Sequence, residues 1–442
     1  MKKRLLLLVS GVASLAPARG QEPARKALVG AYGTVTEKGM AVDSIMAGST
    51  YAVLGVQKGD TLLTLNGQPV SQAPLYHRQA NGLRAGAAVS ITYRHDGKVI
   101  SRTGTAPMRP YDTRSDGEVV YGWAYMGACQ LRTIVRKPQG DGPMPAILLI
   151  PGYTCSSVES YSSGFTGKLV DTWIRAGFAV VTIEKTGMGD SYGCTDCADA
   201  DLATDISVFD AGYRYMQALP CADKNNLFIW GHSMGGVIAP LVAERYQPRG
   251  VVAFATVFRP WSEFLLEMHR VQAPLDGKSY GETEDFVRLM QKVYYEFFRL
   301  KKSPQELYRN PEYKEIVASE LEYTPGARHM WGRHWQFWMQ LDSVDLARSW
   351  ANVKCPVLSA FGGADYIACS RVEHELIARA VNSTHPGHAT YLEVPDVDHL
   401  LTRNNDWVSA HKHIADAAYR EANFHQGFAD KVTAWMQSQL KR

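Results

Sequence analysis

The 442-residue sequence lacks the features that mark several classes of protein. It has no run of about eighteen apolar residues, so a membrane-spanning helix is not expected. Its formal net charge is only +3, and no basic run is interleaved with aromatic residues, so a nucleic-acid partner is not expected either. Hydrophobic residues make up 45% and charged residues 21%, which is ordinary for folded domains, and the length favours two globular units.

Cysteine is scarce, and none occurs in the first hundred residues. Cys194 and Cys197 form a C-x-x-C pair, but they lie in a loop rich in glycine and aspartate, and no second C-x-x-C completes a zinc site. We therefore expect a local structural disulfide or separate bridges here, rather than redox or metal chemistry. An odd total leaves at least one cysteine free or paired between chains. The seven cysteines are Cys129, Cys155, Cys194, Cys197, Cys221, Cys355 and Cys369.

The N-terminus has the pattern of a short export signal. Three basic residues (Lys2–Arg4) precede an apolar core (Leu5–Val9), and small residues follow through Gly20. This predicts a signal peptide over residues 1–20, cleaved after Ala18 or Gly20, and a periplasmic or secreted protein. No cysteine follows closely, which argues against a lipid anchor. The alternative is a disordered cytosolic tail.

Residues 28–108 read as short β-type segments punctuated by glycine. Residues 56–70 (VQKGDTLLTLNGQPV) combine a turn, an alternating strand and a tight Asn-Gly turn. They match the pattern GD-x-L-x-x-x-NG-x-x-V, and the segment resembles a PDZ domain of the bacterial type. The resemblance implies a small β-sandwich that binds a peptide C-terminus as an added strand, with residues 30–33 as the candidate carboxylate-binding loop. The alternative is a domain without a ligand that packs on its neighbour.

After a polar linker over 109–117, strand-like runs alternate with helical segments across residues 118–440. This alternation is typical of a parallel α/β sheet. The predicted helices cover 169–175, 202–219 and an amphipathic stretch over 406–440. The predicted strands are 146–150, 178–183, 227–230, 251–255, 357–361 and 390–394.

The alternation stops between residues 258 and 350, where the sequence is helix-rich and aromatic with no strand-like run. The segment is too long for an ordinary loop, so it predicts a helical cap inserted into the α/β unit. Trp331, Trp335 and Trp338 have i, i+4, i+7 spacing and are expected to share one helix face. Such a stripe either packs in the core or forms an aromatic wall of the substrate pocket.

The sequence Gly231-His232-Ser233-Met234-Gly235 follows the predicted strand 227–230 and precedes a helical segment. This strand–turn–helix order is the context of a G-x-S-x-G nucleophile elbow. The glycines allow the strand and helix to approach closely, and the helix N-terminus favours developing negative charge on the serine. We interpret Ser233 as a catalytic nucleophile and expect His232 to point away and pack. The alternative is a Gly/Ser turn in a parallel-sheet protein.

A nucleophilic serine needs a base to take its proton and a carboxylate to orient that base. Asp365 follows the predicted strand 357–361 on a glycine-rich loop, and His399 follows the strand 390–394, so both are expected at the same sheet edge as the serine. The alternatives are other histidines as the base and two aspartates beside His399 as the acid: His385, His388, His411 and His413, and Asp396 and Asp398.

The negative charge of the tetrahedral intermediate needs hydrogen-bond donors. The backbone N–H of Met234, directly after the nucleophile, is expected to be one. The loop after strand 146–150 should supply the second, and the N–H of Tyr153, after Gly152, is our candidate. No metal ion or organic cofactor is implied.

Residues 115–440 therefore resemble an α/β-hydrolase of the lid-bearing serine esterase and peptidase group. Glu184–Ser191 (EKTGMGDS) resembles the D-x-R-G-x-G-x-S loop that follows the fourth main strand in many members, with Glu184 in place of Asp and Thr186 in place of Arg. Pro151-Gly152 stands where His-Gly is more usual. The resemblance implies an α/β-hydrolase fold with a helical cap insertion, preceded by the small β-rich PDZ-like domain.

These features predict an exported serine hydrolase that cleaves carboxylic esters through Ser233, His399 and Asp365 and an acyl-enzyme. The aromatic residues of the predicted cap suit a substrate with an apolar acyl or alcohol group. A second hypothesis is a serine peptidase or aminopeptidase of the same fold, and a third is a non-catalytic peptide-binding scaffold. The cap segment shows no dedicated amine-binding cluster of acidic residues, which a peptidase would use, although Glu282, Glu284 and Asp285 could form one.

Overall fold

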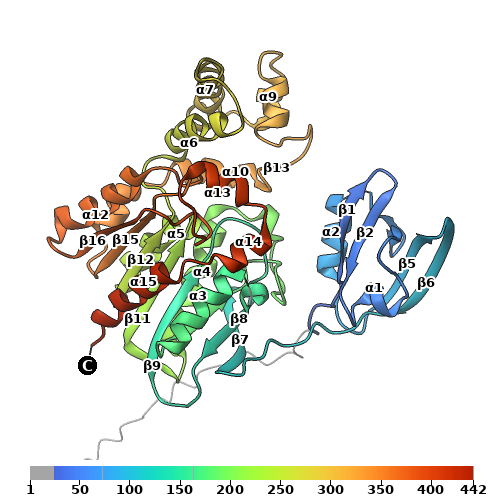
Figure 1. Cartoon of the computed structure of the whole chain (residues 1–442), viewed down its shortest axis with the longest axis horizontal. Helices are drawn as coiled ribbons and strands as arrows, with labels where there is room; N and C mark the ends of the chain where they lie inside the picture. The colour runs from blue at the N-terminus through green and yellow to red at the C-terminus, as the bar shows by residue number, and fades with distance from the viewer. Residues whose placement is uncertain (1–23, 72, 163, 442) are drawn as a thin grey trace, which may run out of the picture. The chain divides into compact units, whose positions relative to one another are not determined.

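The computed structural model describes residues 24–71, 73–162 and 164–441, so the predicted signal peptide lies outside the described residues. Internal contacts divide the chain into two compact units, Met1–Pro110 and Tyr111–Arg442. The boundary falls within the segment 109–117. Each unit is described by itself (Figure 1).

The N-terminal unit is an antiparallel sheet with the strand order β1-β2-β3-β5-β6, with β4 paired to β3. Its core contains Tyr51, Leu62 and Ile91, all fully buried. Asn66 (φ 47°) and Gly67 (φ 77°) adopt the left-handed angles that the predicted Asn-Gly turn requires. The elements are β1 (Ala31–Thr36), β2 (Gly39–Ile45), α1 (Thr50–Val53), β3 (Thr61–Leu65), β4 (Gln68–Pro69), α2 (Ala73–Gly82), β5 (Ala88–His95) and β6 (Lys98–Thr105).

The second unit is built on an eight-stranded sheet with the order β16-β15-β12-β11-β9-β10-β8-β7. The six strands from β16 to β10 run parallel, whereas β8 and β7 form an antiparallel edge. The strands are β7 (Glu118–Met126), β8 (Cys129–Lys137), β9 (Met144–Ile150), β10 (Ala179–Ile183), β11 (Ala222–His232), β12 (Gly250–Phe254), β15 (Val357–Gly362) and β16 (Ala389–Val394).

Helices cover both faces of this sheet, so the side chains of its central strands are buried alternately in two cores. On β9, Ile147 packs in the core formed with α3 (Gly164–Arg175) and α15 (Gln426–Ser438). Leu148 packs in the opposite core, formed with three further helices: α4 (Leu202–Ala218), α5 (Met234–Tyr246) and α12 (Arg371–Thr384). The predicted final amphipathic stretch is divided into α13 (Trp407–His413), α14 (Ala417–Ala422) and α15.

The segment between β12 and β15 is a helix-rich insertion, called the cap segment below, and its helices α6, α7 and α9 rise beyond the sheet in Figure 1. The sequence predicts no strand in this segment, but the structure contains a short hairpin. Its strands are only two residues long, so they leave no periodic pattern in the sequence. The elements are α6 (Trp261–Leu275), α7 (Tyr280–Tyr294), a π-helical turn (Tyr295–Arg299), α8 (Pro304–Tyr308), α9 (Lys314–Ser319), β13 (His329–Met330), β14 (Arg333–His334), α10 (Trp335–Asp342) and α11 (Leu346–Ala351).

The predicted helical stripe of three tryptophans is wrong. Trp331 lies in the turn of the β13–β14 hairpin, where it has φ 50° and Gly332 has φ 72°. A helix cannot pass through two consecutive residues with positive φ, so α10 begins only at Trp335. Only Trp335 and Trp338 therefore share a helix.

The cysteines of the C-x-x-C pair belong to two separate disulfides. Cys129 bonds Cys194, and Cys155 bonds Cys197. The other three cysteines (Cys221, Cys355 and Cys369) are free.

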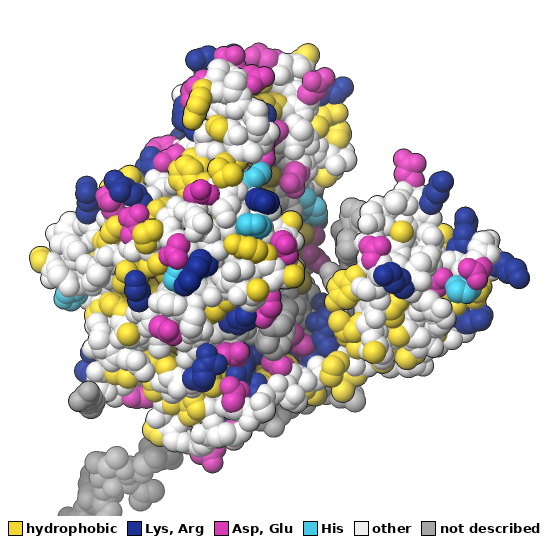
Figure 2. Space-filling model, viewed as in Figure 1, with side chains coloured by type: hydrophobic (Ala, Val, Ile, Leu, Met, Phe, Trp, Pro, Cys, Tyr) yellow, Lys and Arg dark blue, Asp and Glu magenta, His cyan; other side chains and the backbone are white. Residues whose placement is uncertain are grey.

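Figure 2 shows acidic and basic side chains interspersed on the visible face of each unit. Among the residues that the structure describes, no helix is long and apolar enough to cross a bilayer.

Candidate active site

Ser233 occupies the turn between β11 and α5, with φ 55° and ψ −124°. A non-glycine residue with positive φ is strained, and the surrounding glycines are what make the turn possible. A Cβ at Gly235 would lie 2.0 Å from the carbonyl oxygen of Ile150, and one at Gly231 would lie 2.5 Å from the carbonyl oxygen of Gly235. Sheet and helix therefore meet at a distance that only glycine permits.

Asp365 and His399 meet at the carboxyl edge of the sheet. Asp365 follows β15, and its Oδ2 is 2.9 Å from Nδ1 of His399, in the loop after β16. The other carboxylate oxygen accepts the N–H groups of Ile367 and Ala368, both at 2.8 Å. Asp365 is fully buried, so its orientation is fixed by these three hydrogen bonds.

The competing residues have other partners. Asp398 accepts the N–H groups of Leu400 and Thr402 and so shapes the histidine loop, while Asp396 contacts His425. Neither has a hydrogen bond to His399 among the described residues. The other candidate bases lie away from Ser233: His385 and His388 contact Thr384 and the carbonyl of Lys354, and His411 and His413 contact Asp276 and Asn404.

The environments of Asp365 and His399 stabilise the charged form of both. Burial alone would lower the pKa of His399, but the charge and hydrogen bond of Asp365 outweigh burial and raise it above its usual value. Burial alone would raise the pKa of Asp365, but the charge and hydrogen bonds of its partners outweigh burial and lower it. The carboxylate is therefore ionised at neutral pH and favours a proton on the imidazole.

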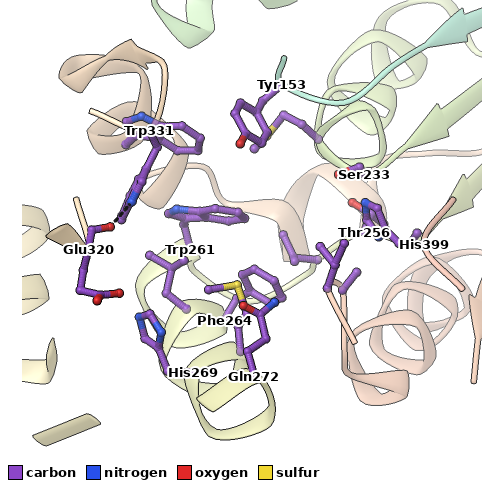
Figure 3. A pocket seen from close by; sticks show the side chains of 18 of the residues that line it. Tyr153, Ser233, Thr256, Trp261, Phe264, His269, Gln272, Glu320, Trp331 and His399 are labelled. Carbon is purple, nitrogen blue, oxygen red and sulfur yellow. Dashed lines mark hydrogen bonds between the residues drawn. The ribbon is translucent and has the colours of Figure 1, made fainter. Parts of the chain in front are cut away.

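No hydrogen bond joins the hydroxyl of Ser233 to a described residue, His399 included. Both side chains nevertheless border one cavity of about 370 Å³, and Figure 3 shows them grouped with Thr256 at one end of it. Catalytic hydrogen bonds are often long in the free enzyme and tighten when substrate binds.

His232 has a role that the sequence analysis missed. It packs on Phe254 with ring centroids 5.6 Å apart, and its Nε2 is 2.8 Å from the carbonyl oxygen of His399. Burial, followed by the charge of His399, lowers the pKa of His232 to about 3, so the ring is neutral and Nε2–H donates. His232 thus fixes the backbone of His399. Only the position of the residue beside Ser233 hinted at this.

The cavity is lined mainly by apolar side chains, of which a group are aromatic (Figure 3). Trp331 and Trp338 line it, whereas Trp335 does not, which corrects the predicted pocket set. Trp335 stacks instead on His334, outside the cavity, because its side chain leaves α10 in a different direction. The aromatic lining residues are Tyr153, Trp261, Phe264, Phe286, Tyr294, Trp331 and Trp338.

The two predicted oxyanion donors belong to residues that border the same cavity as Ser233. Within the described residues, the N–H groups of Tyr153 and Met234 donate to no protein atom. A Cβ built on Gly152 would be 3.7 Å from Oγ of Ser233, so the loop before Tyr153 lies directly against the hydroxyl.

The acidic residues suggested as an amine-binding cluster do not line this cavity. Glu282 caps α7, Glu284 pairs with Arg270, and Asp285 pairs with Arg288. Across the described residues, no group of three or more potential ligands could hold a metal ion.

Comparison with known proteins matches residues 145–403 to the family "Serine aminopeptidase, S33". Esterase EstD of Thermotoga maritima is 21% identical over 267 residues, which is 60% of this chain and 56% of the relative, so the match spans little more than half of that protein. Among solved structures, Est1E of Butyrivibrio proteoclasticus is 13% identical, with a TM-score of 0.44, over 72% of this chain and 98% of its own. Acetyl xylan esterase 1 of Thermoanaerobacterium sp. JW/SL YS485 is 17% identical, with a TM-score of 0.41, over 75% and 86%. The family match covers more than half of the chain, and the chain belongs to this α/β-hydrolase family.

Proposed function

We propose that the protein is a serine hydrolase that cleaves carboxylic esters through Ser233, His399 and Asp365. The observation that carries the proposal is the Asp365–His399 hydrogen bond at the cavity into which Ser233 opens. Family membership supports a hydrolase, and the named esterase of Thermotoga maritima supports an ester as its substrate.

In the proposed reaction, Oγ of Ser233 attacks the ester carbonyl while Nε2 of His399 takes the hydroxyl proton. Asp365 holds Nδ1–H and stabilises the imidazolium. The N–H groups of Tyr153 and Met234 bind the oxyanion. His399 then protonates the leaving alkoxide as the C–O bond breaks, which leaves an acyl-enzyme. Water, deprotonated by the same imidazole, releases the acid and restores the serine.

The cavity supports an ester with an apolar, preferably aromatic, group. Trp261 stacks on Trp338 with ring centroids 5.6 Å apart, and Trp331 meets Trp338 edge-on at 5.2 Å. The opposite end of the cavity holds His269, whose Nε2 is 2.7 Å from the hydroxyl of Tyr294. Burial, assisted by the charge of Lys278, lowers the pKa of His269 to about 4, so its imidazole is uncharged at pH 7, while the charged residues Asp276, Lys278 and Glu320 also line the cavity.

The second candidate is an aminopeptidase, which the family description favours. An aminopeptidase needs a carboxylate for the substrate's amine, and Glu320 borders the cavity. Rates on p-nitrophenyl esters of increasing chain length and on aminoacyl p-nitroanilides separate the two. We expect the esters to be faster by at least tenfold in kcat/KM; faster cleavage of the anilides would reverse the ranking.

Labelling with a fluorophosphonate tests the serine mechanism against a non-catalytic scaffold. The wild type should react and Ser233→Ala should not, while Ser191→Ala, a serine of the EKTGMGDS loop, should still react. If neither the wild type nor Ser191→Ala reacts, the hydrolase proposal is wrong.

We further propose export and peptide binding. Two disulfides support an oxidising compartment.

In the N-terminal unit, β1 is an edge strand, and Gly30 and Tyr32 line an adjacent cavity of about 110 Å³, which supports addition of a peptide strand. Fluorescence anisotropy with peptides ending in a free carboxylate or an amide tests this; equal affinities would contradict carboxylate recognition.

A further inference from the structure

Three consecutive carbonyl groups of the loop after β9 accept hydrogen bonds from two buried cations. Lys185, after β10, donates from Nζ to the oxygens of Gly152 (2.7 Å) and Thr154 (3.2 Å). Arg333, on strand β14 of the cap, donates from a terminal nitrogen to the oxygen of Tyr153 (2.7 Å). The backbone of the predicted oxyanion loop is therefore held from two separate elements.

One carboxylate balances these cations. Asp205, on α4, accepts two hydrogen bonds from Arg333 (3.0 and 3.1 Å) and lies 3.5 Å from Nζ of Lys185. The three side chains are at most 3% exposed. Burial lowers the pKa of Lys185 to about 8, and the charge of Asp205 opposes that shift. Removing charged side chains from water costs free energy, and a buried cluster of three charged side chains calls for a functional reason.

The geometry of the peptide bond supplies that reason. The carbonyl of Gly152 and the N–H of Tyr153 belong to one peptide unit, and no peptide bond of the described chain is cis. In a planar trans peptide these two groups point in opposite directions. When Lys185 fixes the carbonyl of Gly152 on one side of the loop, it also fixes the N–H of Tyr153 on the other side, the direction in which an oxyanion donor must point.

Arg333 also connects the loop to the cap. It follows Trp331 and Gly332 in the hairpin, and Trp331 lines the substrate cavity. The ring of Tyr153 contacts Trp338 edge-on, with centroids 5.2 Å apart. A shift of the hairpin would therefore move both the cavity wall and the carbonyl of Tyr153.

We propose that Lys185 and Arg333 are positioning residues that hold the oxyanion loop in its reactive orientation, and that Arg333 couples this loop to the cap. The inference rests on the proposed ester hydrolysis. Lys185 acts on catalysis alone, because within the described residues its ammonium group bonds to this loop and to Asp205, and it does not line the substrate cavity. Arg333 acts on catalysis and on substrate binding.

The test compares Lys185→Met, Lys185→Arg and Arg333→Met with Lys137→Met. Lys137 is a matched control: it is also buried, pairs with Glu118 and donates to the carbonyl of Gly140, but it does not contact the loop. Lys185→Met should fold, because Arg333 and Asp205 remain as a neutral pair. The measurements are kcat and KM on p-nitrophenyl butyrate, the Ki of a trifluoromethyl ketone that forms a hemiketal oxyanion with the serine, and the melting temperature.

Loss of one oxyanion donor typically lowers kcat by about 10²–10³-fold, and a misoriented donor should lose part of that, about 10–100-fold. For Lys185→Met we expect this fall in kcat, a KM within about twofold of the wild type, and a Ki that rises by the same factor as kcat/KM falls. Lys185→Arg should recover part of kcat. Arg333→Met should lower kcat and raise KM. Lys137→Met should match the wild type in kcat and Ki.

The possible failures are distinguishable. If the wild type hydrolyses the ester but Lys185→Met and Arg333→Met keep its kcat and Ki, the positioning role alone is wrong. The same conclusion follows if their kcat falls without any rise in Ki, or if Lys137→Met loses as much. If the wild type neither hydrolyses the ester nor binds the ketone, the proposed function is wrong, and the positioning role is rejected with it.

Discussion

Replacing Asp365 by asparagine should disable the base while leaving the site almost unchanged in shape. In the wild type, Oδ1 accepts two backbone N–H groups and Oδ2 faces Nδ1 of His399 at 2.9 Å. The asparagine oxygen must keep the two N–H donors, so its NH₂ group faces Nδ1. Nδ1 then becomes an acceptor, the ring proton moves to Nε2, and Nε2 can no longer take the proton of Ser233.

The expected loss is large because the wrong tautomer removes general-base catalysis. In serine proteases, where the same substitution is the established example, kcat falls by about 10⁴-fold, or about 5.5 kcal/mol. We expect a comparable fall in kcat/KM on p-nitrophenyl acetate, with a melting temperature that shows the variant is folded.

The pH profile gives a second readout of the same change. Only neutral His399 can accept a proton, so activity should fall as the pH drops through its raised pKa, which lies above the usual value of about 6.5. Without the charge of Asp365, that pKa should decrease, and the acid limb of the residual activity should move to lower pH.

Asp396→Asn and Asp398→Asn are controls from the histidine loop and should stay within about tenfold of the wild type. The reasoning is refuted if Asp365→Asn stays within tenfold of the wild type with an unmoved acid limb. It is also refuted if Asp398→Asn causes the larger loss.

Three further predictions follow from the site and its supports. Trp331→Ala should raise KM for esters of aromatic acids by about 5- to 30-fold, since it removes about 1–2 kcal/mol of apolar contact, whereas Trp335→Ala should change KM less than twofold; steady-state kinetics decide this. His232→Phe keeps the ring packing but leaves a buried carbonyl unpaired, so kcat should fall about tenfold with a small change in melting temperature; an unchanged kcat would exclude the anchoring role. Removing the disulfide by Cys155→Ala and Cys197→Ala opens a bridge with a sequence separation of 42 and should lower the free energy of unfolding by about 2–4 kcal/mol; identical urea midpoints would contradict this.

The parallel strands could be predicted from the sequence because they lie between two layers of helices. A strand such as β9 is buried on both faces and therefore reads as a continuous apolar run. β8 gives no such run, because it carries Arg132 and Arg136, which are buried beside Asp190 and Asp112. The antiparallel edge was missed for that reason.

The strand–turn–helix at Ser233 and the loops after β15 and β16 could also be predicted, because each lies directly after a recognisable strand. The residues that hold the loop after β9 in place could not be predicted from the sequence. Lys185, Asp205 and Arg333 are far apart in the chain, and a charged side chain normally indicates an exposed position. Their shared burial exists only in the folded structure, where the cap hairpin meets the loop.

The most direct test of the account is to trap the acyl-enzyme. The wild type is mixed with p-nitrophenyl butyrate, quenched in acid within milliseconds, and analysed by intact mass and peptide mapping. The proposed acyl-enzyme should give a burst of p-nitrophenol approaching one equivalent and a butyryl group on Ser233, both absent from Ser233→Ala. A butyryl group on any other residue, or turnover by Ser233→Ala at the rate of the wild type, would contradict it.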